Sequence, residues 1–320
     1  MEYETAGDPM SDLKWTRKTT TKISKELESV GVYVSKSTVG KILKKLNFSL
    51  KSNSKKISNG GKSVKQKDQK KRDLQFRYIT RMIRFFIKNN MPPLSGDTKK
   101  KELIGNFKNP GTRFKKTADL TNDHDFLSYA LGKAALYGVY NVAKNDAFVS
   151  IGMFVKKGAT MTSGDTPEFA VESIQRWLLH VGLQEYPNLQ RILVLVDAGG
   201  SNGYRCHQWK VKLQQLICDK YGIKVTVCHY PPGASKWNPI EHRLFSEITK
   251  NWQGTPLRNF ETVLKYTRTT KTNTGLKVNA MLVEKQYEKG IKASVQEINS
   301  LNIRYHKINS AWNYTISPNV

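Results

Sequence analysis

The sequence predicts an α/β core, a mixed sheet flanked by helices, that follows a small all-α helix-turn-helix module. Two observations predict the core: strand-like runs come first, and a strand, helix, strand unit follows them near the middle of the chain. A third observation separates the module. Residues 20–46 have helical spacing, and the polar, basic stretch after them has almost nothing to bury.

The central unit of the core spans residues 191–252. Its apolar run Ile192–Val196 is typical of a buried strand, and it ends in Asp197 and a glycine-rich turn. A helical pattern over 204–221 and a second strand, Lys224–His229, come next. After a Pro-Pro-Gly breaker, a helix is expected from Asn238, which places Glu241 in its first turn.

Asp197 and Glu241 could therefore meet at one rim of the sheet. Carboxylates at one rim suit Mg²⁺, and two such ions can stabilise the attacking and leaving oxygens of phosphoryl transfer. Structural roles are an open alternative: Asn238 and Glu241 fit a capping box, and Asp197 could brace the turn. A dinucleotide loop at 199–203 is disfavoured, because His229 stands where an acidic residue would end the next strand.

The charge of the chain favours nucleic acid as its partner. The 53 Lys and Arg against 26 Asp and Glu give +27, which attracts polyanions through phosphate contacts. No apolar run has the roughly 18 residues of a spanning helix, and no signal peptide is visible, so a membrane-surface protein ranks far lower. The three cysteines form no CxxC pair, which fits a reducing compartment and supports neither zinc nor a disulfide framework.

The amino-terminal module, residues 1–49, has a helix at 21–30, a turn at Gly31 and a second helix capped by Ser35. Its expected apolar face consists of Val39, Ile42, Leu43 and Leu46. The residues expected to meet base edges are Lys36, Ser37, Thr38 and Lys41. An ordinary helical hairpin with a solvated basic face is the alternative.

A flexible basic linker is expected over 50–72, then a helix over 76–88 that leads into a core domain of residues 73–320. The stretch before Asp97 is predicted to be a poor strand, because Pro93 cannot donate to a ladder and Gly96 has no side chain to pack. Lys99 and Lys100 suit phosphate but equally fit a solvated turn. Residues 103–107, 137–142 and 147–155 read as further strands.

The carboxyl-terminal half holds a helix that begins near Pro167, after an interruption at 156–164. Residues 267–277 could follow DNA backbone. Near the end, the aromatic residues Tyr305, Trp312 and Tyr314 favour a packed tail over a stacking platform.

Several separated runs resemble one known family. VDAGGSNGYR, VCHYPPGASKWNPIEHRLFS and TTKTNTGLKV look like conserved blocks of the ISAzo-thirteen insertion-sequence transposases, a DDE group with a ribonuclease-H-like core. The resemblance extends to DTKKKELIGNFKNPG, NDHDF and EFAVESIQRW. Relative to that family, residues 156–164 look like an insertion. A segment similar to GDPMSDLKW lies well inside the relatives, so a truncated amino end is expected.

This resemblance implies an activity and a site. Asp97, Asp197 and Glu241 would be the catalytic and metal-binding carboxylates, with Mg²⁺ as cofactor and Mn²⁺ as a substitute. Lys236 and Arg243 flank Glu241 and could position DNA backbone. The implied partners are double-stranded DNA, both element ends and target, and further copies of the chain on that DNA, with no membrane and no small-molecule cofactor. The implied location is cytoplasmic and nucleoid-associated in a bacterium.

The function expected from the sequence is that of a DNA transposase that binds element ends, cuts strands and joins them. Two alternatives stay open. One is a catalytically impaired or truncated DNA-binding relic of such an element. The other is a structure-specific nuclease on the same fold, which would cut without joining.

Overall fold

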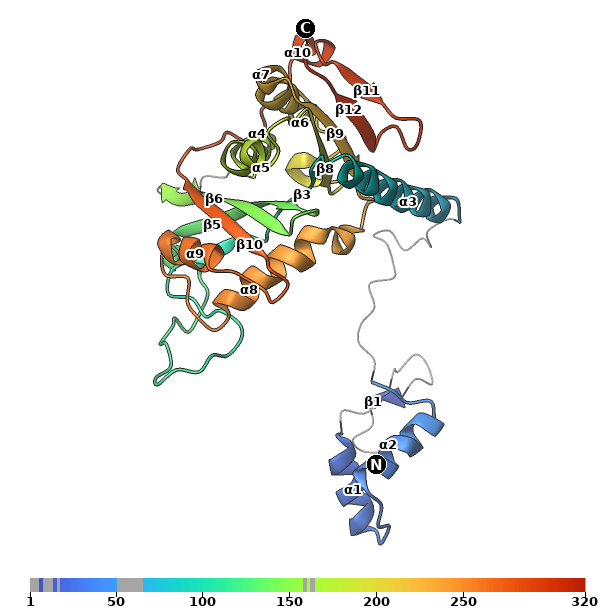
Figure 1. The fold of residues 1–320 in the computed structure, drawn as a ribbon. Helices are drawn as coiled ribbons and strands as arrows, with labels where there is room; N and C mark the ends of the chain where they lie inside the picture. Colours follow the sequence, from blue (N-terminus) through green and yellow to red (C-terminus); the bar gives the residue numbers. More distant parts are fainter. Residues whose placement is uncertain are drawn as a thin grey trace. The chain divides into compact units, whose positions relative to one another are not determined.

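The computed structural model describes residues 6–7, 14–15, 18–50, 66–157, 160–161 and 165–319. The chain forms two compact units, residues 1–63 and 64–320, drawn as one ribbon in Figure 1. Each unit is described by itself. In the described ranges, no helix combines the length and the apolar character needed to cross a membrane.

The amino-terminal unit contains both expected helices. They are α1 (Thr20–Ser29) and α2 (Lys36–Lys45), and a two-residue pair of strands, β1 (Ala6–Gly7) and β2 (Lys14–Trp15), precedes them. Ser35 caps α2 as predicted, because its side chain accepts a hydrogen bond from the Thr38 amide at 3.2 Å. The predicted apolar face is only partly covered: Val39 is buried, whereas Ile42 and Leu46 are 43% and 61% exposed.

The second unit is built on one mixed sheet of ten strands in the described ranges, in the order β10-β6-β5-β3-β8-β9-β12-β11, with β4 beside β5 and β7 beside β6. The strands are β3 (Pro93–Thr98), β4 (Glu102–Ile104), β5 (Gly132–Asn141), β6 (Asp146–Lys157), β7 (Thr160–Met161), β8 (Arg191–Val196), β9 (Lys224–His229), β10 (Lys277–Val283), β11 (Ile303–Tyr305) and β12 (Asn313–Ile316). Central strands β3, β8 and β9 are parallel, and β5 is antiparallel to both β3 and β6.

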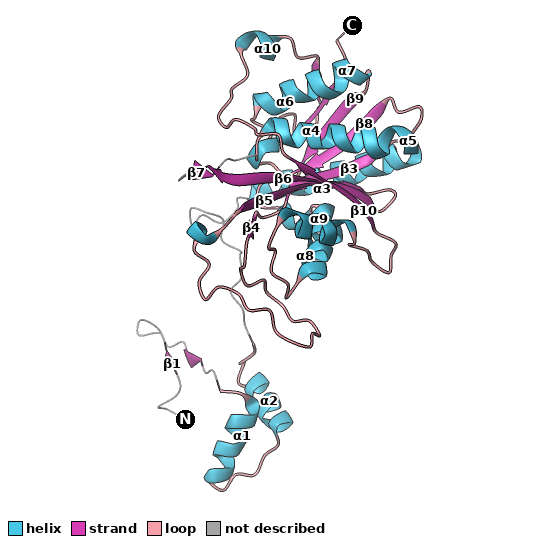
Figure 2. Cartoon of the chain, turned by 90° about the vertical axis from the view of Figure 1, so that its left-hand side faces the viewer, coloured by secondary structure: helices cyan, strands magenta, loops and turns pink. Residues whose placement is uncertain are grey.

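Helices cover both faces of this sheet (Figure 2). The longer helical segments are α3 (Gln66–Lys88), α4 (Pro167–Trp177) with η3 (Leu178–Gly182) and α5 (Leu183–Glu185), α6 (His207–Leu213) with η5 (Gln214–Cys218) and α7 (Asp219–Tyr221), η7 (Glu241–Phe245) with α8 (Ser246–Trp252), α9 (Phe260–Arg268) and α10 (Val295–Asn299). One face packs against α4 and α6, and the other packs against α3, α8 and α9. The mixed sheet with flanking helices confirms the predicted α/β core.

The helix α3 begins earlier than the sequence suggested. It starts at Gln66, so the end of the predicted linker is helical; residues 51–65 lie outside the described residues. A long side chain from this part of α3 contacts the core, since the Arg72 guanidinium donates to the Pro232 carbonyl at 2.6 Å.

The prediction of a poor strand before Asp97 is wrong. Residues Pro93–Thr98 form β3, in the middle of the sheet between β5 and β8. Pro93 is tolerated because it is the first residue of the strand, where its carbonyl still accepts from the Val142 amide at 2.9 Å. Gly96 is needed for close packing: a Cβ there would lie 3.0 Å from the Tyr137 hydroxyl. Asp97 therefore sits on a rigid central strand.

The interruption at residues 156–164 partly extends the sheet. Strand β6 continues through Lys157, and β7 folds back on it, with Lys156 opposite Met161 and Lys157 opposite Thr160. Residues 158–159 and 162–164 lie outside the described residues.

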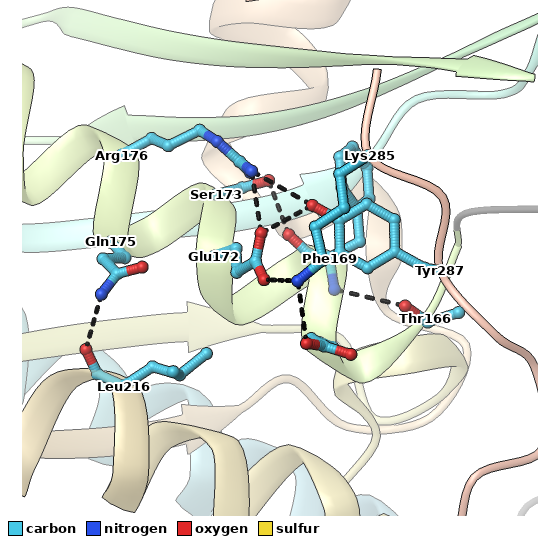
Figure 3. Close-up of polar contacts among 10 residues, drawn as sticks. Thr166, Phe169, Glu172, Ser173, Gln175, Arg176, Leu216, Lys285 and Tyr287 are labelled. Carbon is cyan, nitrogen blue, oxygen red and sulfur yellow. Dashed lines mark hydrogen bonds and ion pairs between the residues drawn. The ribbon is translucent and has the colours of Figure 1, made fainter. Parts of the chain in front are cut away.

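A polar cluster fastens the segment after β10 to α4 (Figure 3). The Glu172 carboxylate on α4 forms ion pairs with Lys285 and with Arg176, the latter at 2.8 Å. It also accepts a hydrogen bond from the Tyr287 hydroxyl at 2.7 Å. Lys285 reaches Glu168 as well, at 3.0 Å. Both carboxylate oxygens of Glu172 therefore have a donor within the chain.

Candidate active site

The register between β3 and β8 brings Asp97 and Asp197 to the same rim. Residues Pro93–Ser95 pair with Leu193–Leu195 in parallel, a constant offset of 100 residues. Continued past the last paired residues, this offset places Asp97 beside Asp197, the residue directly after β8. Both side chains are half-buried. The Thr98 amide donates to Oδ1 of Asp97 at 2.7 Å, which fixes one of its oxygens.

Glu241 reaches this rim from the helix that covers β5. It is the first residue of η7, and it follows the short 3₁₀ turn η6 (Ser235–Trp237). The helix lies close to the sheet because Gly138 on β5 leaves room: a Cβ there would be 2.9 Å from Ile240 Cδ1 and from the Phe245 ring. Gly138 is the residue paired with Asp97, so the start of the helix lies over Asp97.

A buried asparagine joins the three elements. Asn238 donates from Nδ2 to Oδ1 of Asp197 at 3.3 Å, and its own Oδ1 accepts from the Ser95 hydroxyl. Ser95 in turn accepts from the Ile240 amide at 3.2 Å. Both side chains are fully buried. The capping-box alternative is wrong, because the Asn238 amide donates to the Ser235 carbonyl at 2.8 Å and the Asn238 side chain bonds Ser95 and Asp197 instead of capping the helix.

The three carboxylates influence one another electrostatically. The pKa of Asp97 is raised to about 8: burial contributes most, the negative charges of Asp197 and Glu241 add to the rise, and the Thr98 hydrogen bond opposes it. Burial and then Glu241 also raise the pKa of Asp197, while the Asn238 hydrogen bond opposes the shift. No Lys or Arg in the described residues forms a salt bridge with any of the three.

The donor set suits a hard divalent cation. Three carboxylates that repel one another and have no cationic side chain as partner are stabilised when a cation with oxygen preference binds between them. Among the described residues, no three His, Cys, Asp or Glu side chains already converge closely enough to hold a metal ion. Glu241, at the helix start, is only partly buried.

The backbone of Asp197 is held by a series of hydrogen bonds between buried aromatic side chains, which the sequence analysis did not predict. His229, the last residue of β9, lies 2.9 Å through Nδ1 from the Asp197 carbonyl oxygen. Its Nε2 lies 3.1 Å from the Tyr314 hydroxyl, which accepts from the Trp209 indole at 3.0 Å. Burial lowers the pKa of His229 to about 4, so the ring is neutral at pH 7. The position of His229 at a predicted strand end was the only available sequence signal.

The sequence-derived DNA candidates fall into different environments. Lys36, Ser37, Thr38 and Lys41 are exposed on α2. Lys100, Lys236 and Arg243 are exposed in the second unit, and Lys236 lies 5.4 Å from the ring of the exposed Trp237. Lys99 differs from the others: it is 9% exposed, is paired with Glu102, and packs over the Trp252 ring.

A pocket of about 720 Å³ opens beside Asp197. It is lined by the turn Ala198–Gly200 and Gly203–Cys206 on one side and by Pro231–Gly233 on the other. Gly199, Gly200 and Gly233 have no neighbouring heavy atom closer than 3.7 Å to where a Cβ would lie, so a ligand can approach this backbone closely.

A mixed α/β sheet with three carboxylates at its rim is the arrangement that the resemblance to DDE transposases implies. The chain belongs to that group: the family described as Rhodopirellula transposase DDE domain, of the ISAzo-thirteen type, matches residues 1–318. No curated protein matches the chain at a significant level.

Solved structures with a similar chain trace are transposase complexes. "Mos1 transposase paired-end complex with left transposon end" has 15% identity and a TM-score of 0.44, and the match covers 78% of this chain and 65% of that one. "Crystal structure of a pre-cleavage Mos1 transpososome" has 12% identity and a TM-score of 0.45, covering 81% and 73%. The chain thus spans less than two thirds of the first of these relatives.

Proposed function

We propose that this chain is an insertion-sequence transposase that cuts and joins DNA strands with divalent metal ions held by Asp97, Asp197 and Glu241. The observation that carries the proposal is the group of three mutually repelling carboxylates at the rim of the central strands, without a cationic partner in the described residues. Family membership over residues 1–318 supports the same activity.

The strand arrangement supports a ribonuclease-H-like core. The five core strands lie side by side in the order β6-β5-β3-β8-β9. When they are numbered one to five along the chain, this is the order 3-2-1-4-5, and the second strand, β5, is antiparallel to both of its neighbours. This order places the end of β3 next to the end of β8, which is where two of the three carboxylates lie.

Each residue has a distinct task in this proposal. Asp97 and Asp197 provide oxygen ligands from the two central strands, and Glu241 completes the set from the helix start. Mg²⁺, or Mn²⁺ in its place, supplies Lewis-acid stabilisation of the attacking and leaving oxygens when it is bound. Asn238 and Ser95 hold the helix start and Asp197 in register. In this proposal water attacks in the cutting step and a DNA 3′ hydroxyl attacks in the joining step, so no covalent protein intermediate is needed.

DNA recognition is assigned to exposed basic residues. Lys36, Ser37, Thr38 and Lys41 at the start of α2 are proposed to read element ends in the major groove. Lys100, Lys236 and Arg243 are proposed to contact backbone phosphates near the carboxylates. Double-stranded DNA, of element ends and of target, is the substrate class. Because two ends must be brought together, the active form is proposed to contain more than one copy of the chain.

The test separates binding from chemistry. Glu241→Gln keeps the shape of the side chain and removes its charge, so it should abolish Mg²⁺-dependent cleavage of a labelled duplex that carries the element end, while end binding is retained. Glu247→Gln, on the same helix but paired with Lys250, is the matched control and should cleave normally. Cleavage by Glu241→Gln at the wild-type rate would remove Glu241 from the mechanism. A joining assay with a pre-cut end distinguishes a transposase from a nuclease that only cuts.

A further inference from the structure

The buried hydrogen bonds that link Trp209, Tyr314, His229 and Asp197 can have only one donor-to-acceptor direction. A carbonyl oxygen can only accept, so His229 must carry its proton on Nδ1 and donate to Asp197. Nε2 of the neutral ring is then an acceptor, and the Tyr314 hydroxyl donates to it. The Tyr314 oxygen accepts in turn from the Trp209 indole. All three side chains are 0% exposed, so no water competes for these bonds.

These hydrogen bonds connect distant parts of the sequence at one point of the sheet. Tyr314 comes from β12, which pairs antiparallel with β9, and His229 ends β9 directly opposite Val196. The Tyr230 amide also donates to the Val196 carbonyl at 2.8 Å. Two successive carbonyl groups, those of Val196 and Asp197, are therefore held by the end of β9, just where the glycine turn begins.

We propose that His229, oriented by Tyr314, is a positioning residue that fixes the Asp197 peptide and thereby directs the Asp197 carboxylate toward Asp97 and Glu241. The inference rests on the proposed function. Asp197 lies beyond the last ladder pair of β8 with β3, and a glycine-rich turn follows it. Among the described residues its side chain has one hydrogen bond, from Asn238 at 3.3 Å, so the bond from His229 to the backbone adds a further restraint on its orientation.

Two substitutions of His229 distinguish positioning from simple core packing. Asn places its amide nitrogen near the position of imidazole Nδ1 and can still donate to the Asp197 carbonyl. Gln is closer to His in volume, but its amide lies nearer the position of Nε2 and reaches Tyr314 instead. If packing alone matters, His229→Gln should be the better replacement, because it leaves the smaller cavity. If positioning matters, His229→Asn should be.

The experiment compares the full-length wild type, His229→Asn and His229→Gln by two readouts, Mn²⁺ binding without DNA and Mn²⁺-dependent cleavage of an end duplex. We expect His229→Gln to lose about tenfold or more in both, and His229→Asn to stay closer to wild type, although His229→Asn should melt at the lower temperature. Tyr314→Phe should also weaken Mn²⁺ binding, whereas Tyr186→Phe, which removes a buried hydroxyl bonded to Asn141, should not.

The inference is overturned if His229→Gln equals or exceeds His229→Asn in Mn²⁺ binding. A wild-type chain that binds Mn²⁺ but does not cut contradicts the proposed function instead, and the order of the variants in Mn²⁺ binding then decides the inference alone. A wild-type chain that neither binds Mn²⁺ nor cuts overturns both.

Discussion

Glu172 on α4 and Asp97 on β3 are both shielded from solvent, yet the chain surrounds them in opposite ways. Burial raises the pKa of Glu172, but hydrogen bonds from Lys285 and Tyr287 outweigh it, and the net shift is downward. The pKa of Asp97 is raised to about 8, first by burial and then by the charges of two further carboxylates. Glu172 is neutralised by cationic side chains of the protein itself, whereas Asp97 has no cationic partner among the described residues and is open to a cation from solution.

The difference is informative because cations are plentiful in this protein. With 53 Lys and Arg, a cationic side chain beside Asp97 would be easy to supply, and Lys99 is only two residues away. Lys99 instead pairs with Glu102 and packs over Trp252. Buried carboxylates kept apart from nearby lysines are typical of a functional site, whereas the Glu172 cluster is an internal fastening.

The largest expected effect comes from Asp97→Asn. Loss of one metal-binding carboxylate should lower strand cleavage by about a thousandfold, since bound metal contributes several kcal/mol of transition-state stabilisation. Glu172→Gln should cleave within about threefold of wild type under conditions where it is folded. Initial rates on the same labelled duplex measure both. Equal losses in the two variants would erase the functional distinction between the carboxylates.

Stability should respond in the opposite order. Glu172→Gln leaves Arg176 without its carboxylate and Lys285 with Glu168 alone, so the free energy of unfolding should fall by about 2 to 4 kcal/mol. The measurement is denaturant unfolding in the presence of a chelator. A Glu172→Gln chain as stable as wild type would show that the cluster does not fasten the segment after β10 to α4.

The stability effect of Asp97→Asn depends on pH. The pKa of Asp97 is higher in the folded chain than its ordinary 3.8, so the folded state binds more protons and its stability falls as pH rises from about 4 to about 8. Asparagine has no such loss. Without metal, the variant should therefore melt about 2 to 4 °C above wild type at pH 8 and close to it at pH 5. A difference that is the same at both pH values would argue against a raised pKa.

The smallest effect is proton release on metal binding. Because the Asp97 carboxyl holds a proton in part of the population at pH 7, Mn²⁺ binding should release up to about one proton, and less at pH 9. Calorimetry in buffers of different ionisation enthalpy measures the number. Binding with no proton release at pH 7 would contradict the raised pKa of Asp97.

Much of the core could be predicted from the sequence because buried parallel strands leave a clear apolar pattern. Lys224–His229 matches β9 to the residue, and Ile192–Val196 is β8 without its first residue. The strand β3 could not be predicted from the sequence. Its proline is acceptable because it is the first residue of the strand, and its glycine is suited to the close approach of the Tyr137 hydroxyl. Both features depend on tertiary contacts, which local strand propensity does not reveal.

The sequence predicted the candidate carboxylates but not the residues that contact them. Asp197 was predicted at the end of a strand and Glu241 in the first turn of a helix, and the family resemblance added Asp97. The roles of Asn238, Ser95 and His229 depend on which elements become neighbours, which only the sheet order determines. The packed aromatic tail was expected, but its link from Tyr314 to the backbone of Asp197 had no local signal.

The most direct test of the metal-site account is cleavage of a labelled end duplex by wild type and by Asp197→Asn, each with Mg²⁺, with Mn²⁺ and with a chelator. The account predicts metal-dependent cleavage by wild type, none in the chelator, and none by Asp197→Asn, which should still bind the duplex. Cleavage by Asp197→Asn at the wild-type rate, or wild-type cleavage that persists in the chelator, would contradict it.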